Sequence, residues 1–310
     1  MVMKIDIIRS NFKSQERNKD MATGKAFDGN PYAENPHMRF DEGEVASATS
    51  RRGSPLYKTI ETILLACALL CAGPLAAKET ILVVNAHPDD SESMAGTLYL
   101  LKDRFALHYA TLTKGQYRDL QSLGKDGPMA EIRTKEEHAA AALVGAKVHW
   151  FGCKDGQLYA TPDVCQALAD LILELKPRVI FTLWPIDRHL DHAMAGMITL
   201  KAMKLAQYDG EIYFHEVSGL SGSKGFSPVY YVDVTALEDF KRKYSRCYAS
   251  QNSNDHLVTM VMAAAKSRGD QTHFPKGARL AECFAPLTGF RLQGKPCIFN
   301  ELSSPKGGER

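Results

Sequence analysis

The chain has 310 residues, of which 45% are hydrophobic and 24% are charged. Its 38 basic and 36 acidic side chains leave a formal net charge of +2 with histidine neutral. This balance offers no broad positive surface for a phosphate backbone, so the composition excludes a general nucleic-acid binder and agrees with a soluble enzyme.

The first part of the chain differs in composition from the rest. Residues 1–57 are polar and mixed in charge without a sustained apolar period, which predicts a disordered or mis-annotated leader. Residues 58–78 combine a basic flank, a short apolar core and a small-residue end, as a signal peptide does. The segment is short for a membrane span and is broken by Gly73-Pro74.

The position of this segment is unusual, because a signal peptide normally begins within a few dozen residues of the start. A true start at Met38 would explain it, and a buried or anchoring hydrophobic helix is the other interpretation. We expect export to the periplasm or attachment to the membrane or envelope through residues 58–78, with a cytoplasmic location as the alternative.

The next feature is a motif rich in metal-binding side chains. The uninterrupted aliphatic run at 81–84 predicts a buried parallel strand, and residues 87–92 (His-Pro-Asp-Asp-Ser-Glu) follow it closely. Open α/β sheets bind ligands outside the carboxyl ends of their strands, so the motif is placed where a metal site is expected. The alternative is that Asp89 or Ser91 caps a helix that begins near Glu92.

A second such cluster lies about a hundred residues further on. Residues 184–192 (Trp-Pro-Ile-Asp-Arg-His-Leu-Asp-His) follow the strand-like run 178–183. Neighbouring strand ends lie on one edge of a doubly wound sheet, so the two clusters can converge on one ion. Imidazole and carboxylate ligands suit catalytic zinc, whereas structural zinc usually has thiolates, and neither cluster contains cysteine.

Strand-like runs alternate with helical patterns along the chain, which predicts right-handed crossovers and a Rossmann-like α/β fold. We therefore expect a mostly parallel sheet with helices on both faces and the metal site at the carboxyl ends of the strands. Lys241-Arg242-Lys243 is interpreted as the solvated face of a helix. Strands are expected at 80–85, 106–112, 148–151, 178–183, 211–216 and 229–234, and helices at 92–103, 129–144, 164–176, 192–207, 236–249 and 254–267.

Several further motifs occur in a fixed order around the two clusters. They are Ala86 to Glu92 with Gly96-Thr97-Leu98, Thr113-Lys114-Gly115, Arg133 to Glu137, Asp187 to His192, Asp233-Val234-Thr235, Ser250-Gln251 and Ala281-Glu282-Cys283-Phe284. Together they resemble the PIG-L/LmbE-like zinc-dependent N-acetylglucosaminyl deacetylases. The resemblance spans about residues 79–300, which implies one deacetylase domain followed by a flexible tail, 301–310.

The resemblance assigns roles to the matching positions. It implies that His87, Asp90 and His192 bind Zn²⁺, although such ligands also accept Fe²⁺. It makes Asp89 the general base that takes a proton from the attacking water, a role that a carboxylate within hydrogen-bond reach can fill. His189 would stabilise the tetrahedral oxyanion or protonate the leaving amine.

Other polar residues near the two clusters have weaker assignments. Asp191 could hold the imidazole of His189 in one tautomer, or it could cap a helix. Arg133 and Arg188 could contact the substrate, against the alternative of solvated side chains. Glu92 could do the same, although an acidic residue also stabilises the first turn of a helix.

The expected reaction is metal-dependent hydrolysis of a linear amide, which removes acetyl from an N-acetylglucosamine-type, small-molecule amino-sugar conjugate. One alternative keeps the chemistry on another N-acyl substrate. Another is a non-catalytic sugar-binding domain of the same fold, but Asp89 beside the three implied ligands weighs against it, because pure binding needs no general base.

Overall fold

Strand β1 (Thr80–Asn85) lies in the middle of a seven-stranded sheet with the order β3-β2-β1-β4-β5-β7-β6. The computed structural model describes residues 78–116, 127–217, 224–272, 279–287 and 297–302, which belong to one compact unit. The predictions for the leader, for the hydrophobic segment and for the tail lie outside these residues, apart from 78, 301 and 302.

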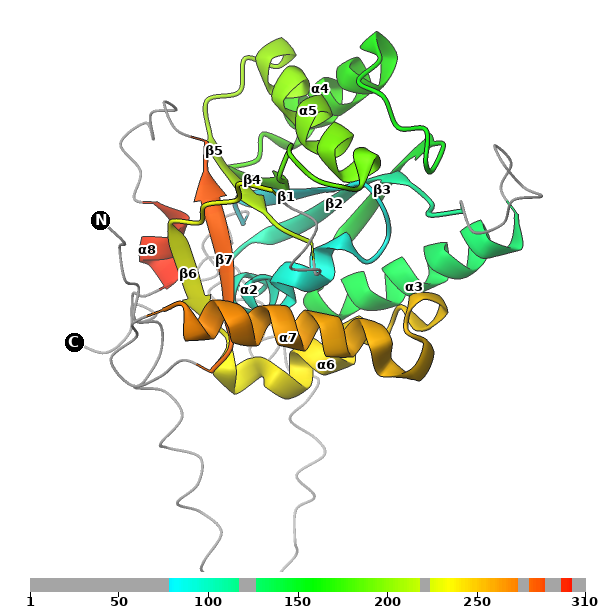
Figure 1. Ribbon diagram of the computed structural model, residues 1–310. Helices are drawn as coiled ribbons and strands as arrows, with labels where there is room; N and C mark the ends of the chain where they lie inside the picture. Colours follow the sequence, from blue (N-terminus) through cyan, green and yellow to red (C-terminus); the bar gives the residue numbers. More distant parts are fainter. Residues whose placement is uncertain (1–77, 117–126, 218–223, 273–278, 288–296, 303–310) are drawn as a thin grey trace, which may run out of the picture. The chain divides into compact units, whose positions relative to one another are not determined.

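The first five strands in the sheet order are parallel to one another, as expected for crossovers that run through helices (Figure 1). Two antiparallel strands then complete the sheet beyond β5. The predicted mostly parallel α/β sheet is therefore confirmed. The remaining strands are β2 (Ala106–Thr113), β3 (Lys147–Cys153), β4 (Val179–Leu183), β5 (Glu211–His215), β6 (Tyr230–Asp233) and β7 (Ala281–Pro286).

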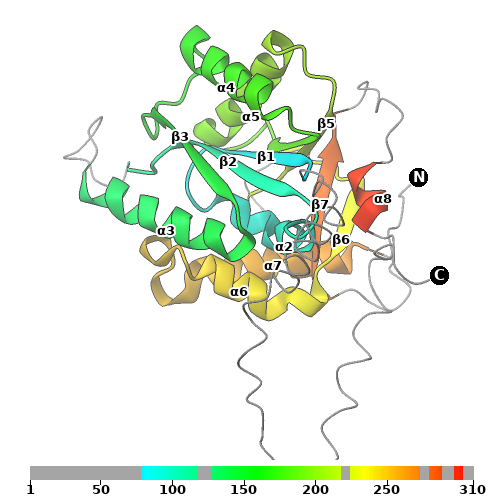
Figure 2. The same ribbon diagram turned by 180° about the vertical axis from the view of Figure 1, so that it is seen from behind.

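Helices cover both faces of the sheet, as predicted (Figures 1 and 2). Successive side chains of β1 point to opposite faces, so Ile81 and Val83 enter one apolar core while Leu82 and Val84 enter another. Helices α4 (Pro162–Leu175) and α5 (Leu190–Leu205) cover the second core. The first core lies under α2 (Ala95–Leu101), α3 (Pro128–Val144), α6 (Glu238–Ser245), α7 (His256–Asp270) and α8 (Ile298–Leu302).

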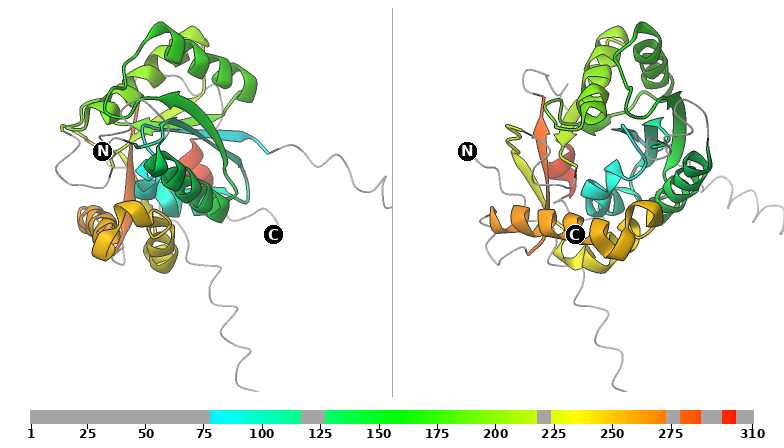
Figure 3. Two further views of the ribbon diagram at one scale, coloured as in Figure 1. Left: turned by 90° about the vertical axis from the view of Figure 1, so that its right-hand side faces the viewer. Right: turned by 45° about the vertical axis from the view of Figure 1, so that its right-hand side comes forward.

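The C-terminal part of the domain was the least predictable. Strand β7 was not expected, because Ala-Glu-Cys-Phe-Ala-Pro has no β-branched residue and few strand formers. Strand β7 pairs with the whole of β6 and contacts α7. Figure 3 shows α6 and α7 side by side from two directions. The helix expected at 92–103 begins differently, with the 3₁₀ turn η3 (Asp90–Met94) in front of α2.

Within the described ranges, no helix has both the length and the apolar character that crossing a membrane requires. The hydrophobic segment at 58–78 is outside this statement except for its last residue.

Candidate metal and active site

The turn after β1 gives two successive aspartates different hydrogen-bond partners. Asp89 has a φ of 96°, in a region that side-chain-bearing residues rarely adopt. The backbone N–H of His87 donates to Oδ2 of Asp90 at 2.8 Å and closes the turn. The helix-cap interpretation is wrong, because Asp89 makes no side-chain capping bond and the Ser91 hydroxyl lies 2.8 Å from the phenol oxygen of Tyr244.

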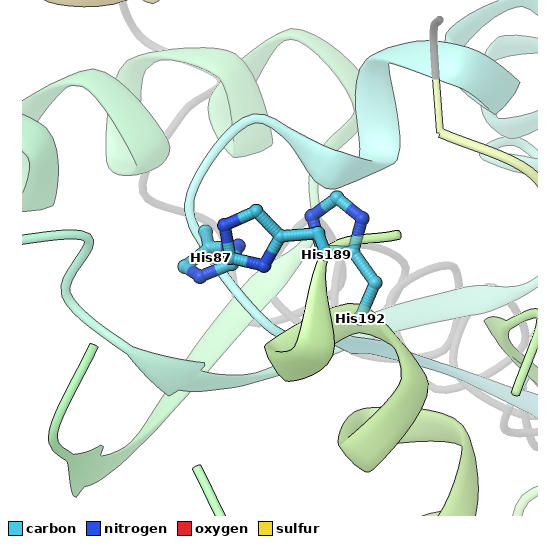
Figure 4. A group of neighbouring side chains, drawn as sticks. All are labelled: His87, His189 and His192. Carbon is cyan, nitrogen blue, oxygen red and sulfur yellow. The ribbon is translucent and has the colours of Figure 1, made fainter. Parts of the chain in front are cut away.

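Three imidazoles meet beside this turn (Figure 4). The ring centroid of His87 lies 4.7 Å from that of His189 and 5.2 Å from that of His192, and His189 lies 4.4 Å from His192. One ligand nitrogen from each ring falls within 4.8 Å of the others. Oδ1 of Asp90 lies 3.8 Å from Nδ1 of His87 and 3.3 Å from Nε2 of His192. The three sequence-predicted ligands are thus brought together, and His189 joins them.

The charges at this cluster depend strongly on one another. Burial alone would raise the pKa of Asp90, but His192 and His87 hold it well below its ordinary value. Burial alone would lower the pKa of His192, yet Asp90 and Asp187 raise it to about 9. The pKa of His189 falls through burial and through the neighbouring imidazoles. A carboxylate between imidazoles at the end of a strand is a donor set that suits a divalent transition metal.

The second nitrogen of His87 faces two carboxylates. Nε2 lies 3.0 Å from Oδ1 of Asp155 and 3.3 Å from Oδ2 of Asp191. Asp191 also accepts the backbone N–H groups of Gly156 at 2.6 Å and Leu158 at 3.2 Å. It therefore contacts His87 and the loop after β3, and not His189 as the sequence suggested, because the first turn of α5 faces that loop. One ligand atom from each of His87, Asp155 and Asp191 lies within 4.8 Å of those from the other two.

Asp155 was missed by the sequence analysis. It stands alone among ordinary loop residues, Lys154 and Gly156, so no spacing marks it. A carboxylate on the outer nitrogen of a metal-binding histidine fixes the orientation of the ring and raises its basicity. Nε2 of His87 is therefore the nitrogen that is held by the protein, which leaves Nδ1 directed toward Asp90.

Arg133 holds Asp89 in place. Its Nη2 lies 2.5 Å from Oδ1 of Asp89 and also donates to the carbonyl of Pro88, while Nη1 donates to the carbonyl of Gly115 at 3.1 Å. Gly115 has a φ of 65°, and a Cβ there would lie 2.0 Å from Nη1. The Thr-Lys-Gly motif thus leaves room for the guanidinium. Burial raises the pKa of Asp89 to about 6, against the opposing charge of Arg133.

A pocket of about 520 Å³ opens onto these groups. Arg133 lines it, although its hydrogen bonds go to the protein, and the exposed Arg188 lines it as well. Glu92, buried in η3, is also one of its lining residues. One wall is apolar and comes from outside the two sequence motifs. It consists of Val217, Leu257 and Met260, with Gln251 beside them.

Comparison with known proteins places this architecture in a family context. Residues 82–203 match the family described as PIG-L, GlcNAc-PI de-N-acetylase. The matched range contains both motifs and every imidazole and carboxylate of the cluster. Members of the family are enzymes.

Individual relatives are more distant. A 4-oxalmesaconate hydratase of Pseudomonas putida is 27% identical over 212 residues, which cover 63% of this chain and 81% of that protein.

Two solved structures show the same fold. The 4-carboxy-2-hydroxymuconate hydratase of Pseudomonas putida has a TM-score of 0.59 and 23% identity over 71% of this chain and 100% of the other. The N,N'-diacetylchitobiose deacetylase of Pyrococcus horikoshii has a TM-score of 0.58 and 23% identity over 74% of this chain and 92% of the other.

Proposed function

Because residues 82–203 form a PIG-L family domain, we propose that this protein is a zinc-dependent deacetylase that hydrolyses the acetamide of an N-acetylglucosamine-type substrate. The observation that carries the proposal is the place of Asp89. Its carboxylate lines the pocket beside the imidazole cluster and is held there by Arg133. A site that only bound sugars would need no base at this point.

In the proposed site, His87, Asp90 and His192 hold the metal and His189 remains free to act on the substrate. Zinc bound there would supply a Lewis acid that makes water a stronger acid and polarises the acetyl carbonyl. Asp90 suits a ligand role because it is buried and contacts both other ligands. His189 suits a substrate role because its side chain is the exposed one of the three imidazoles.

Asp89 would carry the proton transfers of the reaction, and His189 would stabilise the oxyanion. With a pKa of about 6, Asp89 is mainly ionised at neutral pH and close enough to the working pH to accept and return a proton. It takes a proton from the attacking water as the oxygen–carbon bond forms. The neutral His189 donates a hydrogen bond to the oxyanion. When the carbon–nitrogen bond breaks, the amine leaves with the transferred proton and acetate remains.

A hydratase is the second candidate, because a hydratase is among the relatives. The same base could direct water to a carbon–carbon double bond. The name 4-carboxy-2-hydroxymuconate denotes a substrate with several carboxylates. Among the described lining residues, Arg133 is engaged by Asp89, so Arg188 is the arginine open to such a substrate. One open arginine is few for a substrate with several carboxylates, which favours the deacetylase.

The test is to substitute Asp89→Asn, which keeps the size of the side chain and removes the base. We expect acetate release to fall by about 10²- to 10⁴-fold while the bound zinc, measured by elemental analysis, stays at the wild-type amount. Asp163→Asn, an exposed aspartate on α4, is the control and should keep full activity.

Substrates are compared on the wild-type protein in the same assay. Acetate release is measured across a panel of N-acetylglucosaminyl conjugates, and hydration of 4-carboxy-2-hydroxymuconate is followed by the loss of its ultraviolet absorbance. Full activity of Asp89→Asn would contradict the mechanism. Turnover of the muconate without acetate release from any conjugate would assign the hydratase instead.

A further inference from the structure

A buried ion pair lies behind the metal-binding turn and has no part in the chemistry proposed above. Nζ of Lys241, on α6, lies 2.6 Å from Oε1 of Glu282, on β7, and both side chains are 1% exposed. The interpretation of Lys241 as part of a solvated helix face is therefore wrong. Its neighbour Arg242 is on that face, where it pairs with Glu238.

Lys241 binds the main chain of the turn that contains Asp90. Its ammonium group donates to the carbonyl oxygen of Glu92 at 2.7 Å and to that of Ser93 at 3.1 Å. The hydroxyl of Ser93 in turn donates to the backbone carbonyl of Asp90 at 3.1 Å. Turn η3 has only five residues, so two fixed carbonyls leave little freedom for its first residue.

Glu282 binds the next segment, the beginning of α2. Its carboxylate accepts the backbone N–H of Gly96 at 2.9 Å and that of Thr97 at 2.7 Å, and the hydroxyl of Thr97 at 2.6 Å. A Cβ at position 96 would lie 2.6 Å from Cγ1 of Val234 and 3.2 Å from Oε1 of Glu282. The glycine after the first metal motif thus allows the carboxylate to approach the helix.

We propose that Lys241 and Glu282 are positioning residues that fix Asp90 in its metal-binding geometry. They connect α6 to the carbonyls of Glu92 and Ser93 and β7 to the backbone N–H groups of Gly96 and Thr97, within the segment that begins at Asp90. This inference rests on the metal site of the proposed function. The stability of the fold does not by itself explain why these two charges are buried, since a protein with an apolar pair of similar volume is often as stable as one with a buried ion pair. Ligands must be held closely for tight metal binding, and a charged pair with five additional hydrogen bonds does so.

The experiment separates positioning from stability. Lys241→Met, Glu282→Gln and the double substitution are compared with the wild type. Arg242→Met with Glu238→Gln, a partly exposed pair on the same helix, serves as the matched control. Two quantities are measured. One is the thermal midpoint of the metal-free protein, and the other is the Zn²⁺ dissociation constant from competition with a chromogenic chelator.

Each single substitution leaves a buried charge without its partner, so we expect both to lower the thermal midpoint and to weaken zinc binding. The double substitution removes both charges and should recover most of the midpoint. Zinc binding should nevertheless stay about tenfold or more weaker than in the wild type, because the carbonyls of Glu92 and Ser93 are no longer held. The control pair should change neither quantity.

Zinc binding by the double variant as tight as in the wild type would overturn the inference and leave the pair a purely structural role. A wild-type protein that binds no zinc would instead contradict the proposed function. If the double variant does not fold, Thr97→Val decides, since it removes only the hydroxyl that donates to Glu282. Weakening of about threefold would support the inference, and an unchanged constant would contradict it.

Discussion

The parallel and antiparallel parts of the sheet contribute different things to the site. The ends of β1, β3 and β4 lead to every imidazole and carboxylate of the cluster. Beyond β5, helix α7 supplies Leu257 and Met260 of the apolar pocket wall, and α6 and β7 supply the ion pair behind the turn. In the proposed mechanism the reacting groups thus come from one part of the chain, while the other part would line the substrate pocket and position a metal ligand. Three substitutions test this division.

The largest effect is expected for the parallel part. His192→Ala removes one implied ligand, and zinc affinity should fall by more than the roughly 100-fold that follows the loss of an outer hydrogen-bonding partner. Acetate release should fall to background because the Lewis acid is lost. Zinc content after dialysis and acetate release are the measurements. His138→Ala, an exposed histidine on α3, is the control. If His192→Ala retained zinc, the result would indicate that the metal binds instead at the group of His87, Asp155 and Asp191.

An intermediate effect is expected for β5, where the two parts join. Burial lowers the pKa of His215 to about 4 from 6.5. As the pH falls below 6.5, this histidine binds a proton in the unfolded chain but stays neutral in the folded protein. The unfolded state is therefore favoured on acidification, and stability that is present at neutral pH is lost. Between pH 7.5 and pH 5 the loss is about 2 kcal/mol.

Urea unfolding of metal-free wild-type protein and of His215→Asn at both pH values measures this contribution. The variant should be less sensitive to the change in pH than the wild type by about that amount. Other buried groups oppose the trend, such as Glu137, whose pKa burial raises to about 7, but they are present in both proteins, so their contribution largely cancels in the difference. An equal pH dependence in the two proteins would show that the buried imidazole contributes nothing.

The smallest effect is expected for the antiparallel part. Met260→Ala shortens a half-buried side chain of the apolar wall and should raise KM about fivefold, the effect of roughly 1 kcal/mol of apolar contact, with kcat nearly unchanged. The matched control is Met197→Ala, whose side chain is exposed on α5. Steady-state kinetics with the best substrate of the panel gives both constants. A fall in kcat with unchanged KM would contradict the division between the two parts.

The same division explains what the sequence could predict. The parallel part of the sheet can be predicted from local patterns. An aliphatic run followed by imidazoles and carboxylates marks a strand end in α/β proteins, and two such runs predicted the fold class and most residues of the cluster. Asp155 escaped because its partner, His87, lies 68 positions earlier and the loop around it has no spacing signal. Lys241 escaped because a charge run normally marks a solvated face, and its burial depends on Glu282 from a strand that propensity did not reveal.

The backbone at Asp89 has a consequence for how this protein can change. A φ of 96° suits glycine, and an aspartate held there stores about 1–3 kcal/mol of strain. Replacement by glycine would release that strain and remove the base in the same step. Selection for thermal stability and selection for turnover therefore act on this position in opposite directions, and stabilised variants of the protein are best sought elsewhere in the fold.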